Sequence, residues 1–365
     1  MSSLKNDCSL FSRLYIASQI RHGDLDEFFQ HENQACPPSL SQMGDLRTGT
    51  KSDLMPCLEN LFTVKKDLST PRVQVNILDG AAIINMLRPG TAKTFQGYAT
   101  DVFVPLKVDT RSKRGKGVRR RVEPSSAVPG NWQEFLRIND NKTELFSFLA
   151  SNVADINTNK HLITTRGTGV LCSNRQDVSA LAPCTHEEAD TRILLHLQDA
   201  VQQGYSKVSI RTVDTDVGVL ATASANSLNI SELWIAFGAG KSFRFITAHE
   251  IAKALGPDRC VALPMFHAFT GCDTVSCFGG RGKKTAWDTW TTYGDVTPAF
   301  CTLGAMLDPR AIDEWMQPLE RFVVLLYDRT STEEGVNQAR KQLFSKKGRA
   351  IDGLPPTQAA LIQHT

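Results

Sequence analysis

The sequence has little that would anchor the chain in a membrane or cross-link it covalently. No stretch approaches the roughly 18 consecutive apolar residues of a membrane span, and residues 1–7 lack the apolar core of a signal peptide. The nine cysteines are an odd number and form no C-x-x-C pair, which argues against a disulfide framework and a zinc ribbon. We therefore expect reduced thiols, no membrane partner, and a nuclear or cytoplasmic protein.

Charge is also low in net amount, at +3 over 365 residues, and no motif repeats at a fixed period, which excludes a solenoid. A hydrophobic content of 41% with 22% charged residues is typical of a globular protein with a core. The basic residues are nevertheless concentrated in one place. Residues 111–121 read RSKRGKGVRRR, without any acid. Such a run is typical of a solvated surface loop, a nuclear localisation signal or a nucleic-acid contact.

Composition divides the chain into three predicted parts. Residues 1–70 read as a partly helical extension, since helical spacing of apolar residues gives way to a segment rich in Pro, Ser, Gly and Thr. Residues 71–295 form the predicted main domain, with the basic run inside an insertion at 106–130. Residues 296–365 form a helical extension.

Alternating strands and helices in the main domain predict an α/β fold. Residues 73–78, 208–213 and 233–237 are compact β-type runs, and residues 185–203 carry an apolar face at helical spacing that ends at Gly204. Residues 131–152 are also predicted to be helical, and residues 162–165 to form a strand. This alternation predicts a mainly parallel central sheet covered by helices on both faces.

Carboxylates recur where these predicted elements meet. They stand in Glu187-Glu188-Ala189-Asp190 at a helix start, in Asp214-Thr215-Asp216 after a strand, and in Gly271-Cys272-Asp273-Thr274; Asp79 also follows a strand. Each group alone has an ordinary structural explanation as a helix cap or a turn. Together they fall at the same ends of the predicted elements, which in a parallel sheet form one crevice. Since carboxylates are costly to bring together without a cation, the pattern predicts a divalent-metal site.

A glycine-rich turn follows these carboxylates. Gly280-Arg281-Gly282-Lys283-Lys284 leads into a predicted helix, and it lacks the spacing of a Walker A loop. Backbone N–H groups and lysines at such a turn favour contact with a phosphate backbone rather than with bases. We expect a helix-hairpin-helix element after the core.

The order of these motifs resembles that of the 5′-nuclease group of PIN-like proteins, the structure-specific flap and repair endonucleases. Those enzymes carry an aspartate after the first strand, acidic residues opening a helix, a D-x-D after a strand, and a G-x-D before a glycine-rich hairpin, and the match covers roughly residues 73 to 290. The chain is similar, more closely, to a large group of uncharacterised animal proteins that share the HEEADTR, DTDV and FHAFTGCDT stretches, a group that implies no activity. The nucleases carry one further aspartate, for which Asp101 and Asp109 are the candidates here.

The resemblance implies hydrolysis of phosphodiester bonds in DNA or RNA, branched or single-stranded, with two divalent cations, Mg²⁺ or Mn²⁺. The implied catalytic residues are Asp79, Glu188, Asp190, Asp214, Asp216 and Asp273, and Glu187 is an alternative metal ligand to Glu188. The implied nucleic-acid contacts are Lys113, Arg114, Lys116, Arg119, Arg120, Arg121, Gly280, Gly282, Lys283 and Lys284.

Two other classes of function stay open from the sequence. The first is a catalytically inactive relative that binds nucleic acid or serves as a scaffold. The second is a metal-dependent transferase that uses Asp214 and Asp216 to hold a metal-nucleotide. The zinc-protease motif H-E-x-x-H is excluded, because Asp190 stands where its second histidine belongs.

Overall fold

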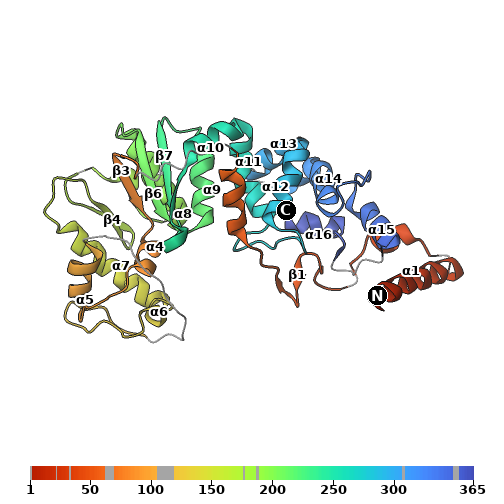
Figure 1. The fold of residues 1–365 in the computed structure, drawn as a ribbon, viewed down its shortest axis with the longest axis horizontal. Coiled ribbons are helices and arrows are strands. Elements are labelled where there is room, and N and C mark those ends of the chain that lie inside the picture. Colours follow the sequence, from red (N-terminus) through yellow and green to blue (C-terminus); the bar gives the residue numbers. More distant parts are fainter. Residues whose placement is uncertain are drawn as a thin grey trace. The chain divides into compact units, whose positions relative to one another are not determined.

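The computed structural model describes residues 2–21, 23–32, 34–61, 70–104, 119–175, 177–185, 189–305, 309–347 and 353–365. The chain forms two compact units (Figure 1): unit 1 comprises residues 1–64 and 251–365, and unit 2 comprises residues 65–250. In the described part of the chain, no helix has both the length and the apolar character needed to cross a membrane.

A mixed four-stranded sheet forms the centre of unit 2. Its order is β3 (Val75–Leu78), β6 (Lys207–Thr212), β7 (Glu232–Phe237) and β8 (Arg244–Thr247). The first three strands are parallel and β8 runs antiparallel to β7. The five residues from Val208 to Thr212 are all buried, which requires cover on both faces of the sheet. The predicted α/β class and mainly parallel sheet are confirmed.

Three helices pack against this sheet and carry its connections: α4 (Gly80–Met86), α8 (Ala189–Gln202) and α9 (Thr215–Ser224) (Figure 1). Leu197 of α8 and Val217 of α9 are fully buried because they lie on the helix faces turned to the core. Helix α9 starts at Thr215, immediately after the turn that follows β6. The strand and helix together therefore fix the position of Asp214 and Asp216.

The rest of unit 2 packs around an aromatic cluster. Phe95, Tyr98, Trp132 and Phe135 are buried together, with the Tyr98 and Trp132 ring centroids 4.7 Å apart. The predicted helix at 131–152 is divided, as α6 and α7, and the predicted strand at 162–165 is β4. The elements are α5 (Phe95–Gly97), the π-helix η2 (Tyr98–Phe103), α6 (Trp132–Phe135), α7 (Asn139–Ala154), β4 (Ile163–Arg166), β5 (Gly169–Cys172) and the 3-10 helices η3 (Ser179–Leu181) and η4 (Gly240–Ser242).

Unit 1 is mainly helical and has its own aromatic core. Phe266, Phe269, Trp290, Phe300 and Phe322 are each at most 1% exposed, and the Phe266 and Trp290 rings stack with centroids 4.4 Å apart. Its elements are α1 (Ser2–Arg21), α2 (Leu25–Phe29), β1 (Ser41–Gln42), β2 (Asp45–Leu46), η1 (Lys51–Asp53), α3 (Leu54–Glu59), α11 (Pro257–Phe269), α12 (Lys283–Thr292), η5 (Gly294–Val296), α13 (Thr297–Ala305), η6 (Pro309–Trp315), α14 (Met316–Tyr327), α15 (Val336–Lys347) and α16 (Gln358–His364).

These units divide the chain differently from the predicted domains 1–70, 71–295 and 296–365. The division at residue 250 falls inside α10 (Ala248–Leu255), and the N-terminal segment joins the C-terminal helices. Helix α3 packs on α12, with Leu54, Met55 and Leu58 fully buried, and the Phe29 and Phe344 ring centroids lie 5.5 Å apart. Phe29, Leu54, Met55 and Leu58 thus contribute to the core of unit 1.

Candidate metal centre

Two of the predicted acidic positions follow neighbouring parallel strands of the sheet. Leu78 at the end of β3 pairs with Arg211 of β6, and the Asp79 backbone N–H donates to the Arg211 carbonyl at 3.0 Å. Asp214 follows β6 after one intervening residue, Val213. The sequence-based expectation that Asp79 and Asp214 share one edge of the sheet is confirmed.

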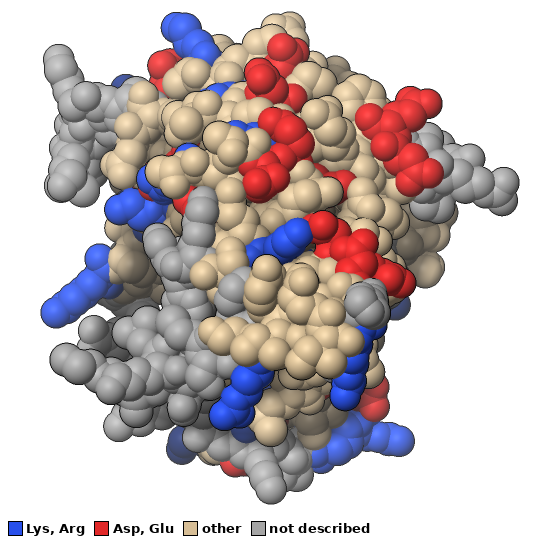
Figure 2. Space-filling view, turned by 90° about the vertical axis from the view of Figure 1, so that its right-hand side faces the viewer, with Lys and Arg blue, Asp and Glu red and all other residues tan. Residues whose placement is uncertain are grey.

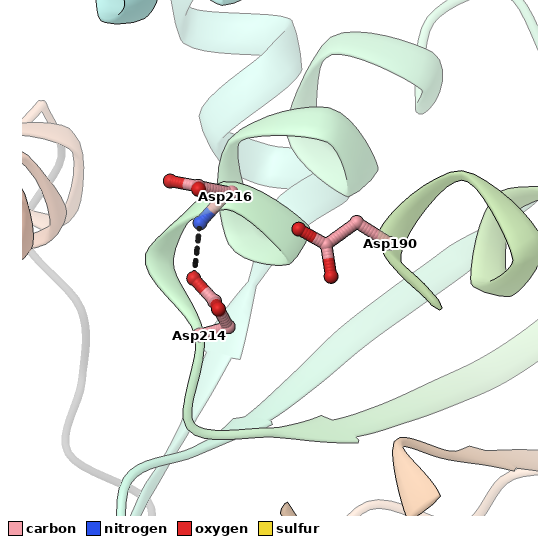
Figure 3. Close-up of side chains that lie close together, drawn as sticks. All are labelled: Asp190, Asp214 and Asp216. Carbon is pink, nitrogen blue, oxygen red and sulfur yellow. Dashed lines mark hydrogen bonds between the residues drawn. The ribbon is translucent and has the colours of Figure 1, made fainter. Parts of the chain in front are cut away.

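Three carboxylates gather at this edge (Figure 3). Asp190 lies in the first turn of α8, Asp214 is the N-cap of α9, and Asp216 lies in the first turn of α9. One carboxylate oxygen from each residue lies within 4.8 Å of those of the other two, and all three residues are half-buried. We call Asp190, Asp214 and Asp216 the acidic triad.

The local backbone explains why the carboxylates of Asp214 and Asp216 lie close together. Asp214 is extended, with φ −91° and ψ 131°, and its Oδ1 accepts the backbone N–H of Asp216 at 3.0 Å (Figure 3). This bond satisfies one of the N–H groups at the start of α9, and the helix dipole favours negative charge there. Asp190 lies in the first turn of the neighbouring helix α8, so the triad is built from residues at the starts of two helices (Figure 3).

The spacing of the triad suits a hard divalent cation. Oxygen ligands held about 2.1 to 2.5 Å from Mg²⁺, Mn²⁺ or Ca²⁺ lie about 3 to 5 Å from one another, and the upper limit of 4.8 Å in the triad falls inside this range. Three carboxylates at this range repel one another unless a cation or protons neutralise them. The residues present therefore fit one such ion.

Asp79 is held beside the triad, but it is not one of its three members. The carboxylate is 7% exposed, and its Oδ1 accepts the Ala82 N–H at 3.1 Å, which makes Asp79 the N-cap of α4. Its Oδ2 accepts the Thr212 hydroxyl at 2.9 Å, and the same hydroxyl oxygen accepts the Asp214 N–H at 3.0 Å. Thr212 therefore links Asp79 to the turn that carries Asp214.

A buried arginine supports the same edge. Arg211 is 6% exposed and its guanidinium donates to the carbonyls of Thr212 and Ala236 at 2.9 and 2.6 Å. It also donates to the Gly238 carbonyl at 2.6 Å. Burial lowers the pKa of Arg211, and the nearby charge of Asp79 opposes that change. The guanidinium thus ties the ends of β6 and β7 together and places a positive charge near the acidic edge.

Sequence reasoning missed Arg211 and Thr212. The predicted strand V-S-I-R-T-V carries a charged arginine inside a compact β-type run, and a threonine two positions before Asp214 is the residue type that caps turns. These two signals were available from the sequence.

Several predicted residues lie outside the described part of the chain. These are Asp109, Lys113, Arg114, Lys116, Glu187 and Glu188. Asp101 is described; it is exposed on η2, where its Oδ1 accepts the Thr100 hydroxyl at 2.9 Å.

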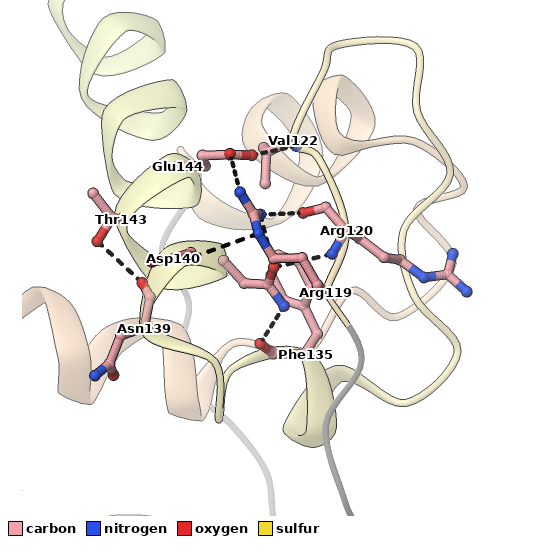
Figure 4. Close-up of polar contacts among 9 residues, drawn as sticks. Arg119, Arg120, Val122, Phe135, Asn139, Asp140, Thr143 and Glu144 are labelled. Carbon is pink, nitrogen blue, oxygen red and sulfur yellow. Dashed lines mark hydrogen bonds and ion pairs between the residues drawn. The ribbon is translucent and has the colours of Figure 1, made fainter.

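The described end of the basic run is partly occupied by intramolecular contacts (Figure 4). Arg119 donates to Asn141 Oδ1 at 3.0 Å and forms ion pairs with Glu144 and Asp140 of α7. The hydrogen bond from Arg119 lowers the pKa of Glu144 and raises the pKa of Arg119 itself. Arg119 therefore anchors this segment to α7. Arg120 and Arg121 are exposed, and the side chain of Arg120 projects away from α7 (Figure 4).

The remaining predicted residues belong to unit 1. Asp273 is exposed and its Oδ2 lies 2.7 Å from the Lys51 ammonium. Lys283 is 3% exposed, and its ammonium donates to the His267 carbonyl and, at 2.8 Å, to the Thr270 hydroxyl. Lys283 thus stabilises the C-terminal end of α11 and does not face solvent.

The loop 270–282 joins α11 to α12 in the region of the predicted helix-hairpin-helix element. Gly280 has a φ of +67°, which favours glycine, and Gly282 is the N-cap of α12. Lys284 is exposed. On the face drawn in Figure 2, acidic groups and scattered basic side chains are both present, so neither sign covers the described surface there.

Comparison of the chain with known protein families, with curated proteins and with solved structures finds no match.

Proposed function

We propose that unit 2 is a divalent-cation-dependent hydrolase of phosphodiester bonds in nucleic acid, as the resemblance to the PIN-like 5′-nucleases implies. The acidic triad supports this proposal, because three carboxylates within 4.8 Å of one another form a ligand set for a hard cation. The order of the carboxylates along the chain resembles that of the 5′-nucleases, and this resemblance supports nucleic acid as the substrate class.

In this proposal the triad holds a Mg²⁺ or Mn²⁺ ion. When bound, such an ion supplies Lewis-acid polarisation of a phosphoryl oxygen and a more acidic water. The Asp214 carboxylate is kept in place by the hydrogen bond that it accepts from the Asp216 N–H. The Thr212 hydroxyl oxygen accepts the Asp214 N–H and so holds the turn between β6 and α9. Asp79 is oriented by the Thr212 hydroxyl and adds negative charge close to the site. The second ion implied by the resemblance stays a prediction.

The engagement of Asp79 favours one alternative, a catalytically inactive nucleic-acid-binding relative. Both carboxylate oxygens of Asp79 already accept hydrogen bonds, from Ala82 and Thr212, so a second ion would have only the remaining lone pair of each oxygen and would have to fit around these bonds. An inactive relative would bind the cation and the nucleic acid but would not cleave the nucleic acid.

The test compares two Asp→Asn variants of the full chain. Asp216→Asn removes one triad charge, and Asp155→Asn removes an exposed carboxylate of unit 2 outside the triad. Calorimetric titration with Mn²⁺ and Mg²⁺ should show affinity lowered roughly 10- to 100-fold in Asp216→Asn. Asp155→Asn should match wild type. Circular dichroism of both variants checks that each is folded.

Cleavage is measured on labelled single-stranded and flap DNA and on the corresponding RNAs, with Mg²⁺ or Mn²⁺. Wild type and Asp155→Asn should cleave at the same rate, and Asp216→Asn should lose most of this activity. Equal cleavage by the two variants would rule out the triad as the catalytic site. Cation binding and nucleic-acid binding without cleavage of any substrate would replace the hydrolase by the inactive relative.

A further inference from the structure

The turn between β7 and β8, residues 238–243, lies at the same end of the sheet as the acidic triad. Thr212 and Phe237 are paired at the ends of β6 and β7, so the chain enters this turn beside the segment that leads to Asp214. None of the motifs that predict the nuclease includes this turn.

The shape of the turn is fixed by its own contacts. Gly238 has a φ of +82°, and a Cβ atom there would lie 2.6 Å from the Ser242 carbonyl oxygen, so only glycine fits without movement. The Ser242 hydroxyl donates to the Ala239 carbonyl at 2.8 Å, and the Phe243 N–H donates to the Gly240 carbonyl at 3.2 Å. The turn is therefore already ordered without a partner.

Phe243 is exposed but held in place. Its side chain is 38% exposed, the ring meets that of Phe245 edge to face at 5.2 Å, and the guanidinium carbon of Arg211 lies 4.9 Å from its centroid. Arg211 itself is fixed by its bond to the Gly238 carbonyl. A ring supported on two sides and open on another loses little conformational freedom when a second flat ring stacks on it.

Positive charge flanks this ring. Lys241 is exposed and Arg244 is half-exposed, and residues 238–247, which read GAGKSFRFIT, contain no acid. Arg244 lies over the Phe237 ring at 5.2 Å and donates to the Ser242 carbonyl at 3.3 Å. Cations interleaved with aromatic rings complement a strand of nucleic acid, whose phosphates are negative and whose unstacked bases are flat.

We propose that residues 238–244 are a binding surface for single-stranded nucleic acid, with a base stacked on Phe243 and phosphates contacted by Lys241 and Arg244. That the ligand is nucleic acid rests on the proposed function. That residues 238–244 form a binding surface is argued from the contacts and charges of the turn alone. A duplex hides the faces of its bases, so the exposed ring selects a single strand. The surface delivers that strand to the sheet edge that carries the triad.

The test measures binding of a fluorescent oligothymidylate to the full chain by anisotropy, with EDTA present so that cleavage is absent. Phe243→Leu keeps the apolar bulk and removes the aromatic face, whereas Phe243→Tyr keeps the ring. We expect the affinity of Phe243→Leu to fall by about tenfold. Phe243→Tyr should bind like wild type, and a blunt duplex should bind wild type and Phe243→Leu equally.

Charge is tested separately with a matched pair of lysines. Lys241→Ala should lower the slope of log affinity against log salt by about 0.7, the value for one phosphate contact on a single strand. Lys160→Ala, an exposed lysine elsewhere in unit 2, should leave the slope unchanged. Wild-type affinity in both Phe243→Leu and Lys241→Ala would overturn the proposed surface.

The two proposals fail in different ways. Cleavage by wild type with an unchanged KM in Phe243→Leu would refute the surface and leave the hydrolase standing. Ring-dependent binding without cleavage would support the surface and refute the hydrolase. Tight binding of a basic or acidic peptide, with no affinity for the oligonucleotide, would refute the nucleic-acid surface.

Discussion

At the scale of single residues, partial burial of His196 on α8 makes stability depend on pH. Desolvation, and to a smaller extent the charge of Arg192, lower the pKa of His196 to about 4, against the opposing effect of Asp199. Between pH 6.5 and 4 the unfolded chain binds a proton that the folded chain does not. The histidine therefore leaves stability intact above about pH 6.5, and stability falls as the pH drops toward 4, by roughly 2 to 3 kcal/mol.

Urea unfolding at pH 7 and pH 4.5 measures this loss. His196→Gln should show a smaller decrease in the free energy of unfolding between the two pH values than wild type does. His161→Gln, which changes an exposed histidine of the same unit, is the control and should keep the wild-type decrease. An identical decrease in all three proteins would contradict a half-buried, neutral His196.

At the scale of elements, the turn after β7 depends on one glycine. Gly238→Ala forces a Cβ atom against the Ser242 carbonyl oxygen, whereas Gly204→Ala meets no atom within 4 Å although its φ is +85°. Gly204→Ala should cost about 1 kcal/mol from the left-handed conformation alone. Gly238→Ala should cost about 3 kcal/mol, because a steric clash is added. Thermal unfolding of the two variants measures the difference, and equal losses would show that the turn relaxes freely.

Local pattern was sufficient to predict the strands that carry the site. The runs at 208–213 and 233–237 agree with β6 and β7 within one residue at each end, because β-branched and aromatic residues are concentrated in them. Because Asp79 and Asp214 each follow a predicted parallel strand, the pattern also predicted that they lie at the same end of the sheet. The buried roles of Lys283 and the α7 contacts of Arg119 could not be predicted, since a basic residue near glycines reads as exposed until its partners are known.

At the scale of the whole molecule, the division into units depends on contacts between distant parts of the sequence. The packing of α3 on α12 and of α2 on α15 joins residues separated by more than two hundred positions, and no local periodicity encodes such pairs. The predicted boundary at residue 295 was set just after the last recognised motif, whereas the two units of the structure are defined by their separate cores. Each core, the sheet of unit 2 and the aromatic cluster of unit 1, should therefore have its own stability.

This separation predicts where a bound cation acts. The triad lies entirely within unit 2, so Mn²⁺ at about one hundred times its dissociation constant should stabilise that unit by about 2.7 kcal/mol. Hydrogen exchange of the full chain, read by mass spectrometry, measures the effect in the slowest amides of β6 and β7. Those of α11 and α14 in unit 1 should be unchanged. At the same Mn²⁺ concentration Asp216→Asn should weaken the slowing in β6 and β7, to a stabilisation of about 0.4 to 1.4 kcal/mol for a 100- to 10-fold loss of affinity. An equal slowing in both units of that variant would show that the cation acts on the protein without the triad.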